Sequence, residues 1–222
     1  KGDFVTSPTI SNLFSEIIAV WIVSTWEVFG KPKLFNIVEL GPGDGSLSEV
    51  LVRTFKNFPA FNDSVKIFLY EKSNFLKNIQ KKNIKSLNVK WIKNFKEISG
   101  GPVIFFGNEF FDAIPIKQFF YSNKNLFEKC YVFNGKCLEE TYCKPILKDL
   151  LYLKSFKVLK KLNFIEYPKL GLKELSRIAK KIKTLSGGVL LIDYGYVGRL
   201  NKNTIQIVMN NRKINKSNLL KN

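Results

Sequence analysis

An apolar run that ends in three alternating glycines, F-N-I-V-E-L-G-P-G-D-G over residues 35–45, constrains the fold of this 222-residue chain more than any other stretch. Nearly continuous apolar residues from Leu34 to Leu40 are typical of a parallel strand covered on both faces. Ser46 is expected to cap a helix that continues through Phe55. A strand, a glycine turn and a helix N-terminus together predict a site for a nucleotide-like ligand at the carboxyl edge of a sheet.

The spacing of these glycines decides between two classes of ligand. The dinucleotide fingerprint is G-x-G-x-x-G, whereas Gly41, Gly43 and Gly45 follow the pattern G-x-G-x-G. Glu39 precedes the first glycine by two residues, and its carboxylate suits the ammonium of an amino acid better than a pyrophosphate. The pattern therefore favours a nucleoside that carries an amino acid over NAD. A glycine turn that binds nothing is the remaining alternative.

Two further predicted strands also end in carboxylates. Val65 to Tyr70 is predicted as a strand that ends at Glu71, which suits the ribose hydroxyls of a bound nucleoside. Val103 to Gly107 is predicted as another buried strand, and N-E-F-F-D-A-I-P follows it. Three polar side chains then lie at the edge where an open parallel sheet binds ligands, namely Asn108, Glu109 and Asp112. The alternative for Glu71 is a solvated side chain at the start of a loop. The alternative for Glu109 and Asp112 is that they only flank Phe110 and Phe111, which pack in the core.

The remaining hydrophobic pattern predicts an α/β fold, a Rossmann-like sheet with an N-terminal helix and an antiparallel β-hairpin excursion. Ser7 and Pro8 are expected to begin the long helix that Gly30 ends. Length favours a single domain over 1–222. Its expected parts are a loop and helix (1–33), a cofactor-binding core (34–115), the hairpin excursion with Asn134-Gly135 at its turn (116–145), and C-terminal helices with a fifth strand at 189–192 (146–222).

Composition excludes several chemistries. The net charge of +18 invites a nucleic-acid role, but Lys outnumbers Arg by 32 to 4 and the lysines form no single stripe, so nucleic acid is not expected as the partner. The chain has no histidine, which removes Ser-His and Cys-His nucleophile pairs and argues against a zinc site of ordinary ligand spacing, so no metal is expected. The three cysteines are expected to be reduced thiols of an intracellular protein. The long N-terminal helix is too polar for a membrane span.

Four stretches in order resemble one family. G-D-F-V-T-S-P, V-E-L-G-P-G-D-G, N-E-F-F-D-A-I-P and L-L-I-D-Y-G-Y look like the motifs of the MidA-type methyltransferases, which include the mitochondrial complex I assembly protein that dimethylates an arginine. The resemblance implies a class I methyltransferase fold and S-adenosyl-L-methionine as cofactor. Thr9 stands where the family usually has Glu, and Asp44 where it often has Arg or Asn. The family's segment with aspartate and histidine beyond the fifth strand is not matched, so truncation is expected.

The resemblance also implies roles for the residues at the predicted site. Glu39 and the three glycines are expected to hold the methionine end of the cofactor, and Glu71 its ribose. A covering loop is expected from Thr6, Ser7 and Pro8. The catalytic candidates that would clamp an acceptor guanidinium are Glu109, Asp112 and Asn108, with Asp193 and Tyr194 as weaker candidates.

The implied partner is a protein that presents an arginine, and homodimerisation is left open. The expected compartment is the cytoplasm, or the mitochondrial matrix in a eukaryote. Two other functions remain as alternatives. One is a non-catalytic assembly or binding protein that retains the cofactor fold. The other is an RNA methyltransferase, which would bind with a strong dependence on salt.

Overall fold

The computed structural model describes residues 12–86, 88–122, 125–156, 162–195, 197, 203–206, 208–209 and 212–213. The chain forms two compact units. Among the described residues, 12–113 and 173–194 belong to the larger unit, and the others belong to the smaller unit. Residues 114–172 of the smaller unit are therefore inserted in sequence between two parts of the larger one, and its other described residues, from 195 onward, follow the larger unit.

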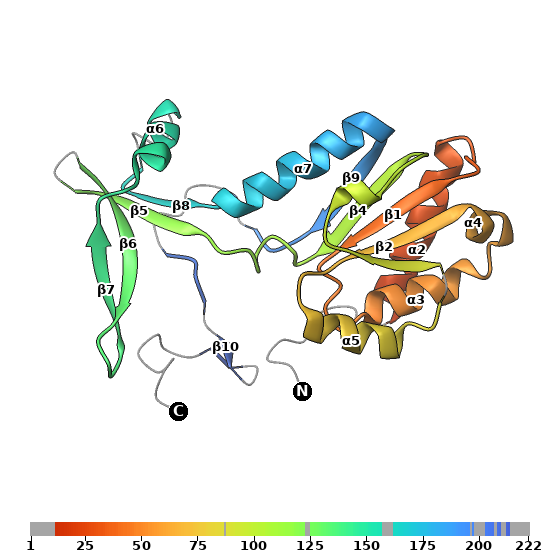
Figure 1. Ribbon diagram of the computed structural model, residues 1–222, viewed down its shortest axis with the longest axis horizontal. Helices are drawn as coiled ribbons and strands as arrows, with labels where there is room; N and C mark the ends of the chain where they lie inside the picture. Colours follow the sequence, from red (N-terminus) through yellow and green to blue (C-terminus); the bar gives the residue numbers. More distant parts are fainter. Residues whose placement is uncertain are drawn as a thin grey trace. The chain divides into compact units, whose positions relative to one another are not determined.

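The larger unit is built on a parallel sheet of five strands in the order β3-β2-β1-β4-β9 (Figure 1). The strands are β1 (Phe35–Leu40), β2 (Val65–Tyr70), β3 (Val89–Ile92), β4 (Val103–Asn108) and β9 (Gly187–Ile192). All neighbouring strands pair in parallel, as the predicted Rossmann-like sheet requires. The order reverses direction between β1 and β4, so the glycine loop after β1 lies at the topological switch point.

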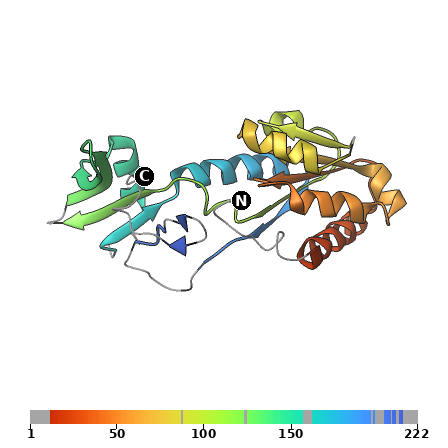
Figure 2. The same cartoon turned by 90° about the horizontal axis from the view of Figure 1, so that it is seen from below.

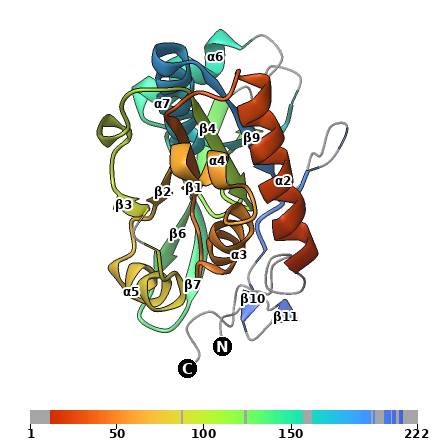
Figure 3. The ribbon, with the colours of Figure 1, turned by 90° about the vertical axis from the view of Figure 1, so that its right-hand side faces the viewer.

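Helices cover both faces of this sheet. On one face lie α2 (Asn12–Val28), α3 (Ser46–Phe55) and α4 (Pro59–Ser64), and the apolar side chains of these helices pack against β1, β2 and β4. On the other face lies α7 (Lys169–Leu185), whose Ile178 is fully buried. Figure 2 shows α2 in red and α7 in cyan on opposite faces, and Figure 3 shows α2 beside α3. The remaining helices of this unit are α5 (Asn74–Asn83) and the short η1 (Phe95–Glu97).

The alternation of side chains along β1 places its one charged residue. Ile37 packs in the core on the face of α2 and α3, whereas Val38 and Leu40 pack in the core on the face of α7. Because successive side chains of a strand point to opposite faces, Glu39 faces the same side as Ile37. The Glu39 carboxylate, which is predicted to bind the ligand, therefore lies on the face of the sheet that α3 covers.

The start of α3 differs from the prediction. The N-cap of this helix is Gly45 at a φ of 88°, and no side chain caps it. Ser46 is the first helical residue, so the prediction that Ser46 caps the helix was wrong. The Asp44 carboxylate instead accepts a hydrogen bond from the Ser46 backbone N–H at 3.0 Å. The glycine at this position thus serves the sharp turn from loop to helix, which only a residue at positive φ permits.

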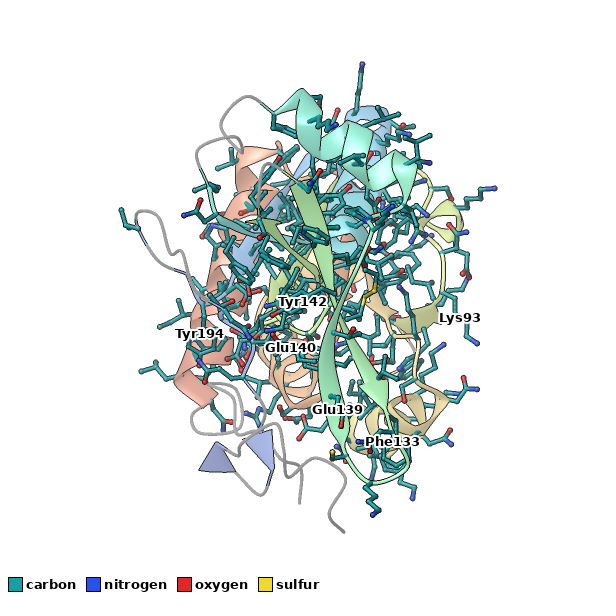
Figure 4. The ribbon with its side chains drawn as sticks, turned by 90° about the vertical axis from the view of Figure 1, so that its left-hand side faces the viewer. Lys93, Phe133, Glu139, Glu140, Tyr142 and Tyr194 are labelled. Atoms are coloured by element: carbon teal, nitrogen blue, oxygen red, sulfur yellow. A yellow bond between two sulfur atoms is a disulfide. The ribbon has the colours of Figure 1, made fainter. Side chains whose placement is uncertain are left out.

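The smaller unit contains an antiparallel sheet in the order β7-β6-β5-β8. The strands are β5 (Lys117–Ser122), β6 (Asn125–Phe133), β7 (Leu138–Cys143) and β8 (Phe164–Tyr167), and α6 (Leu147–Ser155) packs on them. The predicted hairpin is present, with Glu139, Glu140 and Tyr142 along β7 (Figure 4). No strand is predicted at β8 from the sequence, because it is only four residues long and Pro168 follows it directly.

Two further observations concern the cysteines and the smallest strands. The structure joins Cys130 on β6 to Cys143 on β7 in a disulfide, so the expectation of reduced thiols was wrong for this pair. Cys137 is free. Two short strands, β10 (Val208–Met209) and β11 (Arg212–Lys213), pair in antiparallel orientation. None of the described helices is long and apolar enough to cross a membrane.

Candidate cofactor and acceptor site

The register of the parallel sheet brings the predicted ligand residues to one edge. Leu40 pairs with Tyr70 on β2, and Glu39 pairs with Phe106 on β4. The residues that follow each strand therefore emerge side by side: Gly41 after β1, Glu71 after β2, and Glu109 after β4. This is the edge of an open α/β sheet at which ligands bind. The structure thus brings together residues that the sequence separates by up to 68 positions, from 41 to 109.

The glycine loop has the backbone shape and the open space that a ligand needs. Gly41, Gly43 and Gly45 all have positive φ, at 63°, 59° and 88°. A Cβ added to Gly43 would meet no atom within 4 Å, so this side of the loop is open. A Cβ added to Gly41 would lie 2.9 Å from a ring carbon of Phe110, so the turn after β4 packs directly on the loop. The glycine loop after β1 therefore contacts the turn that contains Glu109.

Glu39 is buried beneath the loop, with 3% of its surface exposed. Burial raises the pKa of its carboxyl to about 7, and the nearby Asp44 adds to this rise. A hydrogen bond from the Ser48 hydroxyl on α3 opposes the rise, because it favours the charged carboxylate. Glu39 thus binds α3 to the end of β1, and its charge changes near neutral pH.

A pH-dependent stability follows from this pKa. Between about pH 4.5 and about pH 7 the unfolded carboxyl has lost its proton while folded Glu39 keeps it, so this group lowers the free energy of unfolding as pH rises through that window. We expect Glu39→Gln to remove up to roughly 3 kcal/mol of this dependence. Urea unfolding at several pH values measures it. The control is Glu49→Gln, which changes a more exposed carboxylate on α3. Equal pH dependence in Glu39→Gln and wild type would contradict the prediction.

Glu71 is buried at the end of β2 and is held by two donors. The Ser73 backbone N–H donates to one carboxylate oxygen at 2.7 Å, and the Gln80 side-chain amide donates to the other at 3.3 Å. Two oxygens that each accept one hydrogen bond retain further lone pairs for ribose hydroxyls. The ribose contact of Glu71 stays a prediction, for which the carboxylate is held in place by these two donors.

Sequence reasoning missed Gln80. It is the one residue of α5 that the structure buries completely, although the helix also carries Phe75, Leu76 and Ile79. A polar residue among lysines and asparagines gives no periodic signal, and apolar spacing would have selected its neighbours instead. Only its contacts in three dimensions identify it.

The acceptor side of the edge is a strained turn. Glu109 has a φ of 53°, which is unfavourable for a residue with a side chain, and its backbone N–H donates to the Ile192 carbonyl at 2.8 Å. The Asn108 amide donates to the Glu109 carboxylate at 3.4 Å. Strained backbone that is held by its surroundings occurs preferentially at functional sites. The strained turn therefore lies beside the glycine loop, because Phe110, which follows Glu109, packs against Gly41.

Asp193 supports this turn from β9. One of its carboxylate oxygens accepts hydrogen bonds from the backbone N–H groups of Phe111 and Asp112, at 3.0 and 3.2 Å. Its other oxygen accepts from the Tyr194 backbone N–H at 2.8 Å. These bonds give Asp193 a positioning role at the turn. The Tyr194 side chain is 79% exposed.

The pKa of the Asp112 carboxyl is raised, first by partial loss of contact with water and then by the negative charges of Asp193 and Glu109. A hydrogen bond from the Ala113 backbone N–H opposes this rise. Asp112 is therefore a better proton acceptor than an ordinary aspartate. The loop predicted to cover the cofactor, with Thr6, Ser7 and Pro8, lies outside the described residues. Among the described residues, no cluster of three or more histidine, cysteine or carboxylate side chains could hold a metal ion.

Comparison with protein families decides the class of this site. Residues 17–222 match the family model of S-adenosyl-L-methionine-dependent methyltransferases. The chain belongs to this family. S-adenosyl-L-methionine is the cofactor of this family, and the residues present suit that cofactor, with open space beside Gly43 and two carboxylates at neighbouring strand ends. The resemblance to MidA-type class I methyltransferases is confirmed.

Solved structures share the fold of the methyltransferase. A Burkholderia thailandensis protein bound to S-adenosyl-homocysteine has a TM-score of 0.65 at 17% identity and covers 88% of this chain and 50% of its own. A second, native structure from the same organism has a TM-score of 0.66 at 18% identity, with coverages of 88% and 52%. The predicted Rossmann-like class I methyltransferase fold is thus confirmed.

Curated relatives are similar over most of the methyltransferase chain. Protein arginine methyltransferase NDUFAF7, mitochondrial, of Xenopus laevis is 30% identical over 222 residues, which are 89% of this chain and 51% of the relative. The Caenorhabditis elegans homolog is 29% identical over 244 residues, with coverages of 96% and 55%. The chain thus spans about half the length of these relatives.

Proposed function

We propose that this methyltransferase transfers a methyl group from S-adenosyl-L-methionine to an arginine side chain of a protein. The observation that supports the proposal is the strained Glu109 turn, which follows β4 and whose Phe110 packs against Gly41 of the glycine loop. Carboxylates bind a guanidinium in a fixed geometry through charge-assisted hydrogen bonds. The names of the relatives, which are protein arginine methyltransferases, support the same acceptor.

On the cofactor side, the proposed contacts come from the ends of β1 and β2. The bound cofactor supplies an electrophilic methyl group on a sulfonium. Gly41, Gly43 and Gly45 let the backbone approach the methionine end, and Glu39 attracts its ammonium. Glu71 accepts hydrogen bonds from the ribose hydroxyls. In this proposal Thr6, Ser7 and Pro8 form a cover that excludes water.

On the acceptor side, the proposed work is alignment and proton removal. Glu109 and Asp112 hold the guanidinium, and Asn108 orients Glu109. The nitrogen forms its new bond to the methyl carbon as the sulfur–carbon bond breaks, and the nitrogen then loses a proton. Asp112 accepts this proton, for which its raised pKa suits it. Most of the rate enhancement comes from the alignment, because in-line displacement needs little covalent help.

Two measurements in sequence test the proposal. Calorimetric titration with S-adenosyl-L-methionine and, separately, with NAD is expected to show binding of the first alone. Respiratory complex I subunits are then incubated with the protein and the cofactor, and mass spectrometry is expected to find mono- or dimethylated arginine. Absence of NAD binding alone does not support an arginine acceptor. Methylation of RNA instead of protein would contradict the acceptor class.

The second candidate is a non-catalytic binding protein with the same cofactor site. The net charge of +18 favours it, since a basic surface does not attract an arginine-presenting partner at long range. Tight binding of a partner without any methyl transfer would support this candidate over the enzyme. We further propose that the protein acts in the cytoplasm, or in the mitochondrial matrix of a eukaryote, as the relatives' names suggest.

A further inference from the structure

Gln80 on α5 contacts both halves of the proposed cofactor site. Its side-chain amide nitrogen donates to the Gly43 carbonyl at 2.8 Å and to the Glu71 carboxylate at 3.3 Å. Its side-chain oxygen accepts from the indole N–H of Trp91 on β3 at 2.8 Å. Both N–H groups of the amide are used, and the side chain is 0% exposed.

Trp91 determines which way the amide points. If the amide were flipped, its oxygen would face the Gly43 carbonyl and the Glu71 carboxylate, and its N–H groups would face the Trp91 donor. Three favourable contacts would become three repulsive ones, so the observed orientation is fixed by its partners. The indole donor therefore acts on the glycine loop and on Glu71 through the amide.

Packing reinforces these hydrogen bonds. A Cβ added to Gly45 would lie 3.2 Å from Cγ of Gln80, so α5 lies directly against the loop. The side-chain amide of Asn83, one turn further along α5, donates to the Asp44 carbonyl at 2.9 Å. The helix thus holds the loop at two carbonyls, but only Gln80 also holds Glu71.

We propose that Gln80 is a positioning residue that fixes the glycine loop and the Glu71 carboxylate in one arrangement for the cofactor, with Trp91 setting the orientation of its amide. The inference rests on the proposed contacts of Gly43 and Glu71 with the cofactor. Gln80 itself needs no contact with the ligand. It lowers the cost of binding because the two halves of the site are ordered before the ligand arrives.

Calorimetry with S-adenosyl-homocysteine on the full chain tests this role. Gln80→Met keeps the length of the side chain and removes all of its hydrogen bonds, and we expect about tenfold weaker binding, as for the loss of one to two net hydrogen bonds. Trp91→Phe removes the indole donor and leaves a smaller aromatic ring, with an expected loss of about threefold. The matched control is Asn78→Met on the exposed side of α5, which should bind as wild type. Wild-type affinity of Gln80→Met would overturn the proposal.

A double-mutant comparison separates positioning from general destabilisation. If Gln80 acts partly through Glu71, Gln80→Met should cost about tenfold in wild type but only about threefold in a Glu71→Ala background. The full tenfold loss in both backgrounds would overturn the coupling. Wild-type affinity of Glu71→Ala alone would remove the proposed ribose contact, and the Gln80 inference with it. If Glu71→Ala bound S-adenosyl-homocysteine weakly while Gln80→Met bound it with wild-type affinity, only the proposed role of Gln80 would be overturned.

Gln80→Glu keeps the test decisive if Gln80→Met fails to fold. Its carboxylate would face Glu71 and the Gly43 carbonyl, with Lys81 nearby over the Trp91 ring, and could donate to neither oxygen until it is protonated. We expect the ratio of its Kd to that of wild type to fall at least about threefold between about pH 8 and about pH 6. A ratio that stays constant over this range would overturn the proposal.

Discussion

Glu109→Gln is expected to bind S-adenosyl-L-methionine within about twofold of wild type, yet to lower methyl transfer to a protein arginine by roughly 100- to 1000-fold. The amide is isosteric with the carboxylate and can keep the contact with Asn108. It lacks the charge that would hold a guanidinium in line with the methyl group. A radiolabel transfer assay, run beside a cofactor titration, measures both quantities.

The control for Glu109→Gln is Glu27→Gln, which neutralises a carboxylate on α2 that pairs only with Lys31 across one helical turn. This variant should bind and transfer as wild type. Equal transfer by Glu109→Gln and wild type would argue against an acceptor clamp. Loss of cofactor binding in Glu109→Gln would show instead that the strained turn shapes the glycine loop, against which Phe110 packs.

Glu71→Ala is expected to weaken cofactor binding by roughly 1.5 to 3 kcal/mol, or about 10- to 150-fold, as for lost hydrogen bonds to a charged group. The carboxylate is buried and already oriented by Ser73 and Gln80, so its hydrogen bonds to the ribose cost little ordering. Isothermal titration calorimetry measures the loss. The control is Glu97→Gln, on the short η1 helix, where an exposed carboxylate pairs with Lys90. Unchanged affinity of Glu71→Ala would remove Glu71 from the site.

The sequence predicted the strands of the larger unit because a parallel sheet buried on both faces leaves a strong signal. β2 has the predicted bounds, β1 and β4 differ from theirs by one residue, and β9 begins two residues earlier than predicted. Once strand ends are known, the residues after them are known to share an edge, so Gly41, Glu71 and Glu109 could be grouped without coordinates. The carboxylates of the candidate site were found in this way.

What the sequence could not predict depends on tertiary contacts of polar residues. Ser48 and Gln80 are buried polar side chains whose partners lie on other elements, and neither has a periodic signature. The left-handed backbone conformation of Glu109 could not be predicted, because a glutamate in the sequence gives no indication of a positive φ. Asp193 was predicted as an acceptor residue from its place after β9, but whether a carboxylate faces a ligand or a backbone turn depends on the path of the neighbouring loop.

The insertion of residues 114–172 between the two sequence parts of the larger unit, residues 12–113 and 173–194, has a consequence for how the protein is made. β9 pairs with β4 along its whole length, but a ribosome releases β9 only after the entire inserted segment. Until then β4 remains an open outer strand, and exposed strand edges in nascent chains favour aggregation. Early folding of the inserted antiparallel sheet would shorten the flexible chain between β4 and β9. The parallel sheet would then be completed faster.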